Sequence, residues 1–79
     1  MSAMKQLIET IVKPLVDFPD DVKIDVLEND SSITYQLTVN KTDMGKVIGK
    51  QGRVAKAIRT VVYAAGTSQQ KKIFLEIGE

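Results

Sequence analysis

The chain has 79 residues, the length of a single domain with one modest hydrophobic core. Its hydrophobic fraction of 43% and charged fraction of 27% argue against intrinsic disorder, and no apolar run is long enough to cross a membrane. It contains no cysteine and no histidine, which excludes disulfides, thiolate nucleophiles, Cys/His zinc sites and the commonest general base. We therefore expect a soluble cytoplasmic protein that is not an enzyme and has no cofactor, metal site, membrane contact or small-molecule substrate.

The net charge is only +1, but the charges are distributed unevenly along the chain. Residues 1–30 contain three bases against seven acids, whereas residues 31–79 contain eight bases against three acids. The domain should therefore be dipolar, with a positive half that can attract an anion. A simpler interpretation, that the bases only solvate one helix surface, is left open by these counts.

The first half of the chain predicts one helix and a hairpin. Apolar residues recur with helical spacing over residues 3–17, where Ser2 can cap the helix and Pro14 should bend the last turn or end the helix early. A turn is expected over residues 18–21. Alternating apolar and polar residues then predict strands over residues 22–26 and 33–39, which share one apolar face and are joined by a turn.

The second half begins with two helices. A short helix that contains Met44, Val47 and Ile48 can be capped by Thr42 or Asp43. A longer helix is expected over about residues 52–65, and the glycine at position 66 is well placed to end it.

The last predicted element is a strand, because apolar residues alternate at positions 73, 75 and 77. The expected order is helix, strand, strand, helix, helix, strand. Two packed layers can bury all of these apolar faces, so we predict an α+β fold in which a three-stranded sheet carries three helices on one face.

A glycine-containing segment joins the last two predicted helices. In the sequence Val47-Ile48-Gly49-Lys50-Gln51-Gly52, two glycines three positions apart allow a tight turn and bring backbone N–H groups close to a phosphate. The following helix adds free N–H groups and the positive end of its dipole, and Lys50 and Arg53 add charge. The segment predicts a polyanion site, although Gly49 and Gly52 could also form nothing more than a helix–helix turn.

The motif Val-Ile-Gly-x-x-Gly-basic, placed between a short and a longer helix, resembles the KH domain of RNA-binding proteins. The helix and strand before the core are similar to the type II, bacterial form of this fold. The length of the chain, the segment Ile11-Val12-Lys13-Pro14-Leu15 and the segment Ala57-Ile58-Arg59-Thr60-Val61-Val62-Tyr63 resemble the small bacterial KhpA family. The similarity covers nearly the whole chain, so we interpret residues 1–79 as a single KH domain.

The resemblance implies a groove in which four nucleotides of single-stranded RNA lie against the glycine loop. It makes Gly49–Gly52 a clamp for the RNA backbone and assigns Ile48 to an apolar floor under the bases. The scarcity of aromatic residues argues against a stacking platform. The candidate RNA-binding residues are Val47, Ile48, Gly49, Lys50, Gln51, Gly52, Arg53, Lys46 and Lys56.

Several of these candidates have simpler interpretations. At least one of Val47 and Ile48 is expected in the core, and Lys46, Lys56 and Arg59 could only solvate a surface. Lys56 lies one helical turn beyond Arg53, so the two side chains can follow one phosphate backbone.

The long helix also predicts a surface for self-association. Six apolar residues, at positions 54, 55, 58, 61, 62 and 65, cover about a third of its circumference and can face the sheet. Ala57 and Ala64 extend this arc past Val61, and such small residues would let another helix approach closely. We hypothesise a dimerisation surface at Val61, Ala57, Ala64 and Val54, although the alanines are also ordinary helix formers. The resemblance implies a homodimer and pairing with a second KH-containing protein.

Together these patterns predict a non-catalytic module that binds single-stranded RNA, with a role in post-transcriptional regulation or as an RNA chaperone. The alternative is a protein–protein interaction adaptor in which the glycine loop is only a structural turn. An enzyme acting on phosphates is disfavoured, because the loop lacks the spacing and the terminal Lys-Ser/Thr pair of a P-loop.

Overall fold

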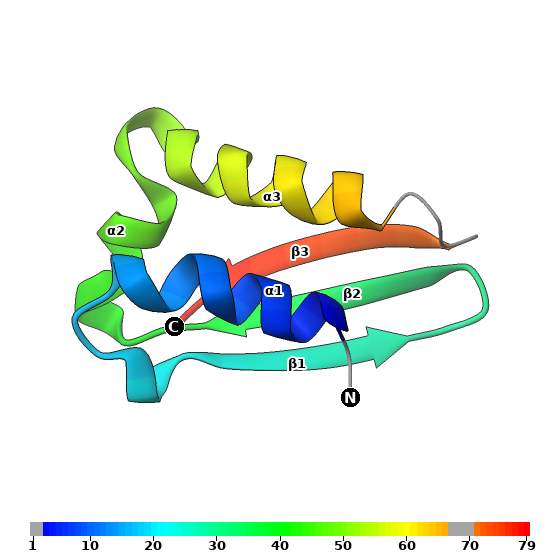
Figure 1. Ribbon diagram of the computed structural model, residues 1–79, viewed down its shortest axis with the longest axis horizontal. Coiled ribbons are helices and arrows are strands. Elements are labelled where there is room, and N and C mark those ends of the chain that lie inside the picture. Colours follow the sequence, from blue (N-terminus) through cyan, green and yellow to red (C-terminus); the bar gives the residue numbers. More distant parts are fainter. Residues whose placement is uncertain (1–2, 67–70) are drawn as a thin grey trace.

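The computed structural model describes residues 3–66 and 71–79, which form helices on one side of a sheet (Figure 1). The helices and strands follow the predicted order α-β-β-α-α-β, so the predicted α+β fold is confirmed. Their bounds are Ala3–Val12 (α1), Lys23–Glu28 (β1), Ser32–Thr38 (β2), Met44–Ile48 (α2), Arg53–Ala65 (α3) and Lys72–Gly78 (β3). Short 3₁₀ turns occupy Lys13–Leu15, Pro19–Asp21, Lys41–Asp43 and Lys50–Gly52.

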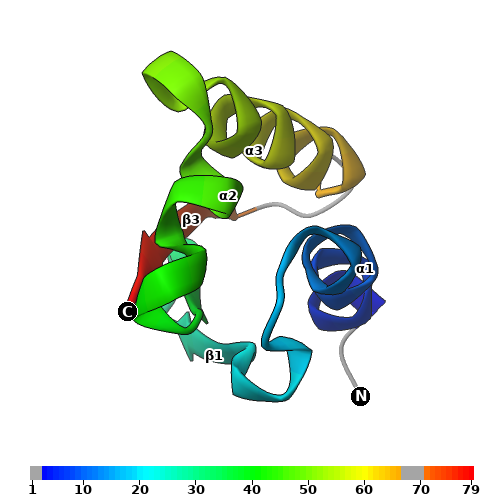
Figure 2. The same cartoon turned by 90° about the vertical axis from the view of Figure 1, so that its left-hand side faces the viewer.

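The sheet has β2 at its centre, in the order β1-β2-β3. Strand β1 pairs with β2 antiparallel, as the predicted hairpin requires, whereas β3 pairs with β2 in parallel. Two parallel neighbours cannot be joined by a tight turn, so the chain between them has to cross one face of the sheet. Helices α2 and α3 form this crossover, and α1 covers the same face beside them (Figure 2).

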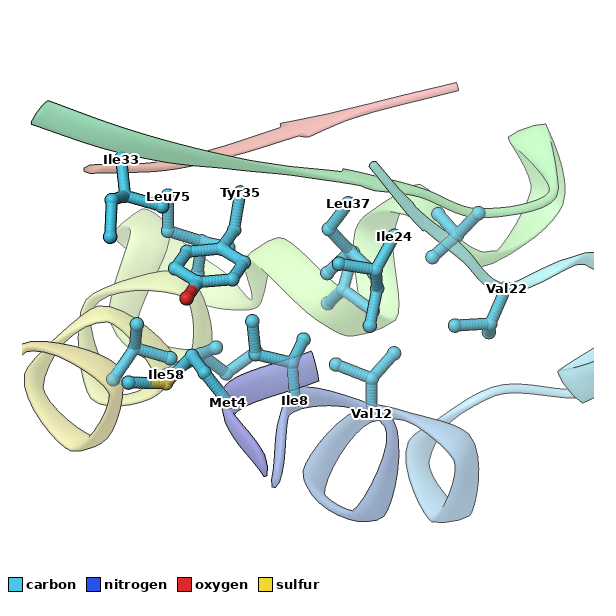
Figure 3. Packing of buried hydrophobic residues seen from close by; sticks show 13 residues of the cluster. Met4, Ile8, Val12, Val22, Ile24, Ile33, Tyr35, Leu37, Ile58 and Leu75 are labelled. Carbon is cyan, nitrogen blue, oxygen red and sulfur yellow. The ribbon is translucent and has the colours of Figure 1, made fainter. Parts of the chain in front are cut away.

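The core lies between the sheet and the three helices (Figure 3). The alternating residues of the strands supply one side of it, and paired positions such as Ile24 opposite Leu37 and Tyr35 opposite Leu75 lie side by side. The buried cluster consists of Met4, Ile8, Val12, Val22, Ile24, Ile33, Tyr35, Leu37, Val39, Val47, Ile58, Val62 and Leu75. The helical and strand periodicities in the sequence therefore identified the correct buried faces.

Of the two effects predicted for Pro14, a bend in the last turn or an early end of the helix, the structure shows the early end. Helix α1 stops at Val12, and the chain continues as a 3₁₀ turn with Pro14 in its first positions. Proline lacks the amide hydrogen that an α-helix would need there. The predicted Ser2 cap lies outside the described residues.

Two details of the predicted packing are wrong. The side chain of Val61 is 43% exposed and Ala65 is also exposed, because α3 turns a narrower face, centred on Ala55, Ile58 and Val62, to the sheet. Val26 is 41% exposed although it alternates with the buried Ile24, and β1, which carries it, is an edge strand with a neighbour on one side only.

The predicted cap of α2 is confirmed in position only. Asp43 occupies the N-cap position of the short helix, but its side chain makes no capping hydrogen bond there; Asn40 caps the preceding 3₁₀ turn, and its Oδ1 accepts a hydrogen bond from the amide of Thr42 at 2.9 Å. This arrangement leaves the carboxylate of Asp43 free for a more distant partner.

Candidate nucleic-acid interface

The glycine loop, residues Gly49–Gly52, makes the turn between α2 and α3. Its φ angles are +74° at Gly49, +58° at Gln51 and +73° at Gly52, all in the left-handed region that side chains disfavour. A Cβ on Gly49 would meet Cγ2 of Val54 at 2.5 Å, whereas a Cβ on Gly52 would point into open space. At Gly49 both the positive φ and the lack of room for a Cβ require glycine, whereas at Gly52 only the positive φ favours it.

The loop hydrogen-bonds some of its own amides. The amide of Gly49 donates to the Gly45 carbonyl at 2.8 Å, and that of Gly52 donates to the Gly49 carbonyl at 3.3 Å. The amide of Arg53 donates to the Lys50 carbonyl. Within the described part of the chain, the amides of Lys50 and Gln51 have no such acceptor, because they open the turn. Two adjacent backbone donors at the tip are thus available to an anion.

Exposed cations surround these donors. Lys50, Arg53 and Lys56 are all exposed, and helix α3 carries no acidic residue in its sequence RVAKAIRTVVYAA. Nη2 of Arg53 lies 3.4 Å from Oε1 of Gln51, so the arginine leans towards the loop. Lys50 lies in the loop and Arg53 directly follows it, so both contribute exposed positive charge to this end of α3.

Two other predicted cations are held by the protein. Lys46 forms an ion pair with Asp17, and its Nζ lies 3.6 Å from Oδ1 of Asp43. Arg59 is half-buried, and its Nε donates to the carbonyl of Leu75 in β3 at 3.2 Å. Both side chains are therefore bonded to other parts of the protein, which makes them less available to a ligand than Lys50 and Arg53.

The two apolar residues before the loop have different environments. Val47 is completely buried in the core, whereas the side chain of Ile48 is 36% exposed. Only Ile48 can contact a ligand directly. The expectation that at least one of the pair belongs to the core is confirmed.

Sequence analysis missed the buried carboxylate of Asp43, which has no exposed surface. Its Oδ1 and Oδ2 accept hydrogen bonds from the amides of Asp17 and Phe18, each at 3.0 Å. The Asp43 cluster (Asp17, Phe18, Asp43 and Lys46) joins the start of α2 to the connection between α1 and β1. No pattern marks this role, because the two partners are 26 and 25 residues away in sequence.

The Asp43 cluster also shifts two pKa values. Burial acts to raise the pKa of Asp43, but the two amide hydrogen bonds and Lys46 outweigh it and lower the pKa below its ordinary value of 3.8. The hydrogen bond to Asp17 raises the pKa of Lys46, against the opposing effect of burial. Both groups are therefore held in their charged forms.

An apolar groove runs between α1 and α3, on the flank of α3 that holds the predicted dimerisation residues. Its volume is about 410 Å³. Three of the four predicted residues line it, namely Val54, Ala57 and Val61, and Arg53 also lines it. Leu7 and Ile11 of helix α1, with Leu15 of the 3₁₀ turn that follows it, supply the opposite wall. We call this feature the α1–α3 groove.

Other kinds of site find no support in residues 3–66 and 71–79. No helix there is long and apolar enough to span a bilayer. The acids of the same residues form no group of three or more that could hold a metal ion.

Comparison with known proteins places the chain in a family. A family model described as "KhpA/KhpB, KH domain" matches residues 5–77. The chain belongs to this family. The resemblance drawn from the glycine motif and the element order is thus confirmed. Membership of the KhpA/KhpB KH-domain family, a family of RNA-binding rather than catalytic proteins, also confirms the expectation that the chain is not an enzyme.

Several curated KhpA proteins are similar over almost their full length. The RNA-binding protein KhpA of Listeria monocytogenes is 64% identical over 76 residues, covering 96% of this chain and 100% of the relative. KhpA of Oceanobacillus iheyensis is 57% identical over 74 residues, covering 94% of this chain and 99% of the relative. KhpA of Bacillus subtilis is 55% identical over 74 residues, covering 94% and 91% respectively.

A solved structure shares the KH fold at low sequence identity. The crystal structure of Era in complex with MgGDPNP and nucleotides 1506–1542 of 16S ribosomal RNA matches 95% of this chain, with a TM-score of 0.69 and 15% identity. This chain spans 29% of the Era chain. At this identity the likeness supports the fold of the KhpA/KhpB domain and nothing more specific.

Proposed function

We propose that the chain is a non-catalytic module that binds single-stranded RNA and clamps its backbone with the glycine loop. The observation that carries this proposal is the pair of available amides at Lys50 and Gln51, next to the exposed side chain of Lys50 and to two exposed cations, Arg53 and Lys56, on a helix without acids. Curated relatives bear the name RNA-binding protein, which supports the same ligand class. The two amides can donate hydrogen bonds to one phosphate, and the nearby cations can neutralise further phosphates of a polyanion.

Each residue has a defined part in this clamp. Gly49 and Gly52 shape the turn, and the amides of Lys50 and Gln51 bind a phosphate. The side chains of Lys50, Arg53 and Lys56 neutralise neighbouring phosphates, and Ile48 lies under a base. The buried Val47 supports the loop from the core, and Lys46 supports it through its ion pair with Asp17. A single module with so few side-chain readers should bind weakly and with little sequence preference.

The clamp can be tested by replacing Lys50 and Gln51 with aspartates. Two negative charges beside the amides should repel a phosphate, so we expect at least a roughly tenfold loss of affinity for a single-stranded RNA oligomer. The same two residue types stand side by side on α1, so Lys5→Asp with Gln6→Asp changes the total charge identically, far from the loop in sequence. Fluorescence anisotropy measures binding, and circular dichroism confirms folding.

The alternative function is a protein-interaction adaptor in which the loop is only a turn. If the loop variant and the control variant both bind RNA as tightly as the parent, the loop is not the RNA clamp and the adaptor function is favoured. A loop variant that loses RNA but keeps a protein partner would instead separate two functions of one domain.

We further propose that the protein forms a homodimer through the α1–α3 groove, using Val54, Ala57, Val61 and Ala64. The exposed Val61 stands beside small residues on a groove whose other wall is apolar, so a second helix can pack closely there. A second KH-containing protein could use the same groove. A dimer would present two clamps to one RNA strand and raise its avidity.

Sedimentation of Val61→Asp tests the dimer. A charge in an apolar interface is unfavourable, so we expect this variant to sediment as a monomer beside a dimeric parent. Tyr63→Asp adds the same charge at a similarly exposed residue of α3 that lies about 160° away around the helix, and this variant should stay dimeric. An unchanged mass for Val61→Asp would remove the groove from the interface.

At the level of the cell, we propose a cytoplasmic role in post-transcriptional regulation or as an RNA chaperone. Weak, sequence-tolerant binding of single strands suits a protein that acts on many RNAs. Crosslinking in cells followed by sequencing of the attached RNA would test this role, with the aspartate loop variant as control. Equal RNA recovery with both proteins would contradict it.

A further inference from the structure

One exposed aromatic residue lies on the same helix as the proposed clamp. The side chain of Tyr63 is 41% exposed, whereas the other tyrosine, Tyr35, is 3% exposed and belongs to the core. Within the described part of the chain, no side-chain hydrogen bond holds the Tyr63 ring in place. At 100° per residue, Tyr63 lies within about 60° of Lys56 and Arg59 around α3. The ring therefore continues a basic flank of the helix.

The structure indicates which way this flank is turned. Arg59 donates to the carbonyl of Leu75 in β3, so the flank faces the strand at the free edge of the sheet. The opposite flank, with Ala57 and Val61, lines the α1–α3 groove. Figure 1 shows α3 running beside β3 away from the glycine loop. Tyr63 is therefore separated from the proposed dimer surface and lies on the side of α3 that faces the sheet edge.

The charge of α3 determines which ligand suits this flank. The helix contains Arg53, Lys56 and Arg59 and no acid, so a chain of phosphates can follow it without repulsion. Ten residues separate Arg53 from Tyr63, a rise of about 15 Å. That distance spans roughly four nucleotides of a stacked strand at 3.4 Å each. A strand held at the loop can therefore reach the ring, and an aromatic face stacks on any base.

We propose that Tyr63 is a base-stacking subsite for single-stranded RNA that runs along α3 from the glycine loop. This inference rests on the proposed RNA clamp and extends its footprint beyond the four nucleotides bound there. It requires one exposed ring and no platform of several aromatic residues, so it agrees with the low aromatic content of the chain. The subsite adds affinity for longer strands with little sequence preference.

Two oligoadenylates of different length test the subsite. The four-nucleotide oligomer occupies the clamp alone, whereas the ten-nucleotide oligomer reaches Tyr63. For the longer oligomer we expect Tyr63→Ala to weaken binding at least about fivefold, and Tyr63→Phe, which keeps the ring, to bind within about twofold of the parent. For the shorter oligomer the parent and both variants should bind equally.

Intrinsic fluorescence provides a second test that does not depend on how well Tyr63→Ala folds. The chain has no tryptophan and only two tyrosines, so tyrosine emission can be observed directly. Stacking of a base on Tyr63 should quench the emission of the parent when the ten-nucleotide oligomer binds. The emission of Tyr63→Phe, which comes from the buried Tyr35, should not change.

The possible results separate the two proposals. If the parent binds both oligomers but Tyr63→Ala binds the longer one equally well and the parent emission is not quenched, the subsite is wrong and the clamp stands. If the parent binds neither oligomer, the clamp is wrong and the subsite fails with it.

Discussion

At the scale of single residues, the glycine loop depends on backbone conformations that most side chains avoid. Gln51 is the one non-glycine residue with a positive φ in the described chain, and it sits between two glycines that also have positive φ. A left-handed conformation costs an ordinary residue roughly 1–2 kcal/mol. The protein therefore maintains a costly turn at the place where two backbone amides have no backbone acceptor among the described residues, which is typical of a functional site.

The two glycines should respond differently to alanine. Gly49→Ala combines a strained φ with a Cβ 2.5 Å from Cγ2 of Val54, so we expect a loss of roughly 2–4 kcal/mol in the free energy of unfolding. Gly52→Ala meets open space and should cost only roughly 1–2 kcal/mol. Urea denaturation measures both values, and equal losses would contradict the steric role assigned to Val54.

At the scale of secondary-structure elements, the Asp43 cluster connects the start of α2 to the segment between α1 and β1 by side-chain hydrogen bonds. Asp43 precedes α2, and its partners Asp17 and Phe18 lie between α1 and β1. Helix α2 has only five residues, too few to be stable by itself. The buried carboxylate thus contributes to holding α2, and the glycine loop that follows it, against the rest of the domain.

This cluster should give the protein a measurable acid dependence. The folded-state pKa of Asp43 is lowered, so its contribution to stability is complete above about pH 4, the unfolded value, and is lost as pH falls through the folded pKa. Asp43→Asn removes this contribution and leaves one of the two part-buried backbone amides, of Asp17 or Phe18, without its acceptor, so the Tm of the variant at neutral pH should fall by about 5 °C or more. The Tm difference from the parent should shrink below pH 4.

The exposed Asp20, in the same connection, provides a control for this measurement. Asp20→Asn should follow the parent in thermal melts across the whole pH range. A Tm difference between Asp43→Asn and the parent that stays constant from pH 7 to pH 2 would show that ionisation of Asp43 does not stabilise the fold.

At the scale of the whole molecule, the structure pairs some charges of the two halves of the sequence with each other and leaves others exposed. Two bases of the positive half, Lys46 and Lys71, are paired with acids of the negative half, Asp17 and Glu28. The bases left exposed around the glycine loop and along α3 are then the ones that a polyanion meets first. A net charge of +1 therefore understates the attraction of this surface for RNA.

Salt should reveal how many phosphates this surface neutralises. If Lys50, Arg53 and Lys56 each neutralise one phosphate, the logarithm of the association constant should fall with the logarithm of salt concentration with a slope of about −2. Arg53→Gln should make the slope less steep by about 0.7. Titrations at several salt concentrations measure both slopes, and a parent slope near zero would contradict electrostatic binding of the RNA backbone.

The sequence by itself determined the elements, their order and the glycine loop. These features depend on local physics: the alternation from Ile33 to Val39, the helical spacing in α3, the missing amide hydrogen of Pro14 and the conformational freedom of Gly49 and Gly52. Each can be recognised from neighbouring residues. The identity of the candidate loop and the family followed from the same information.

Only the tertiary structure decided which side chains are buried or paired across long distances. It set β3 beside β2 in parallel, gave the Asp43 carboxylate its two distant amides, paired Lys46 with Asp17 and left Val61 and Tyr63 exposed. Burial and hydrogen bonding depend on which segments meet in space, and the periodicity of one helix or strand cannot specify its neighbour. For the same reason the aspartate at position 43 could be expected as a helix cap, yet it stabilises a connection that lies more than twenty residues earlier in the chain.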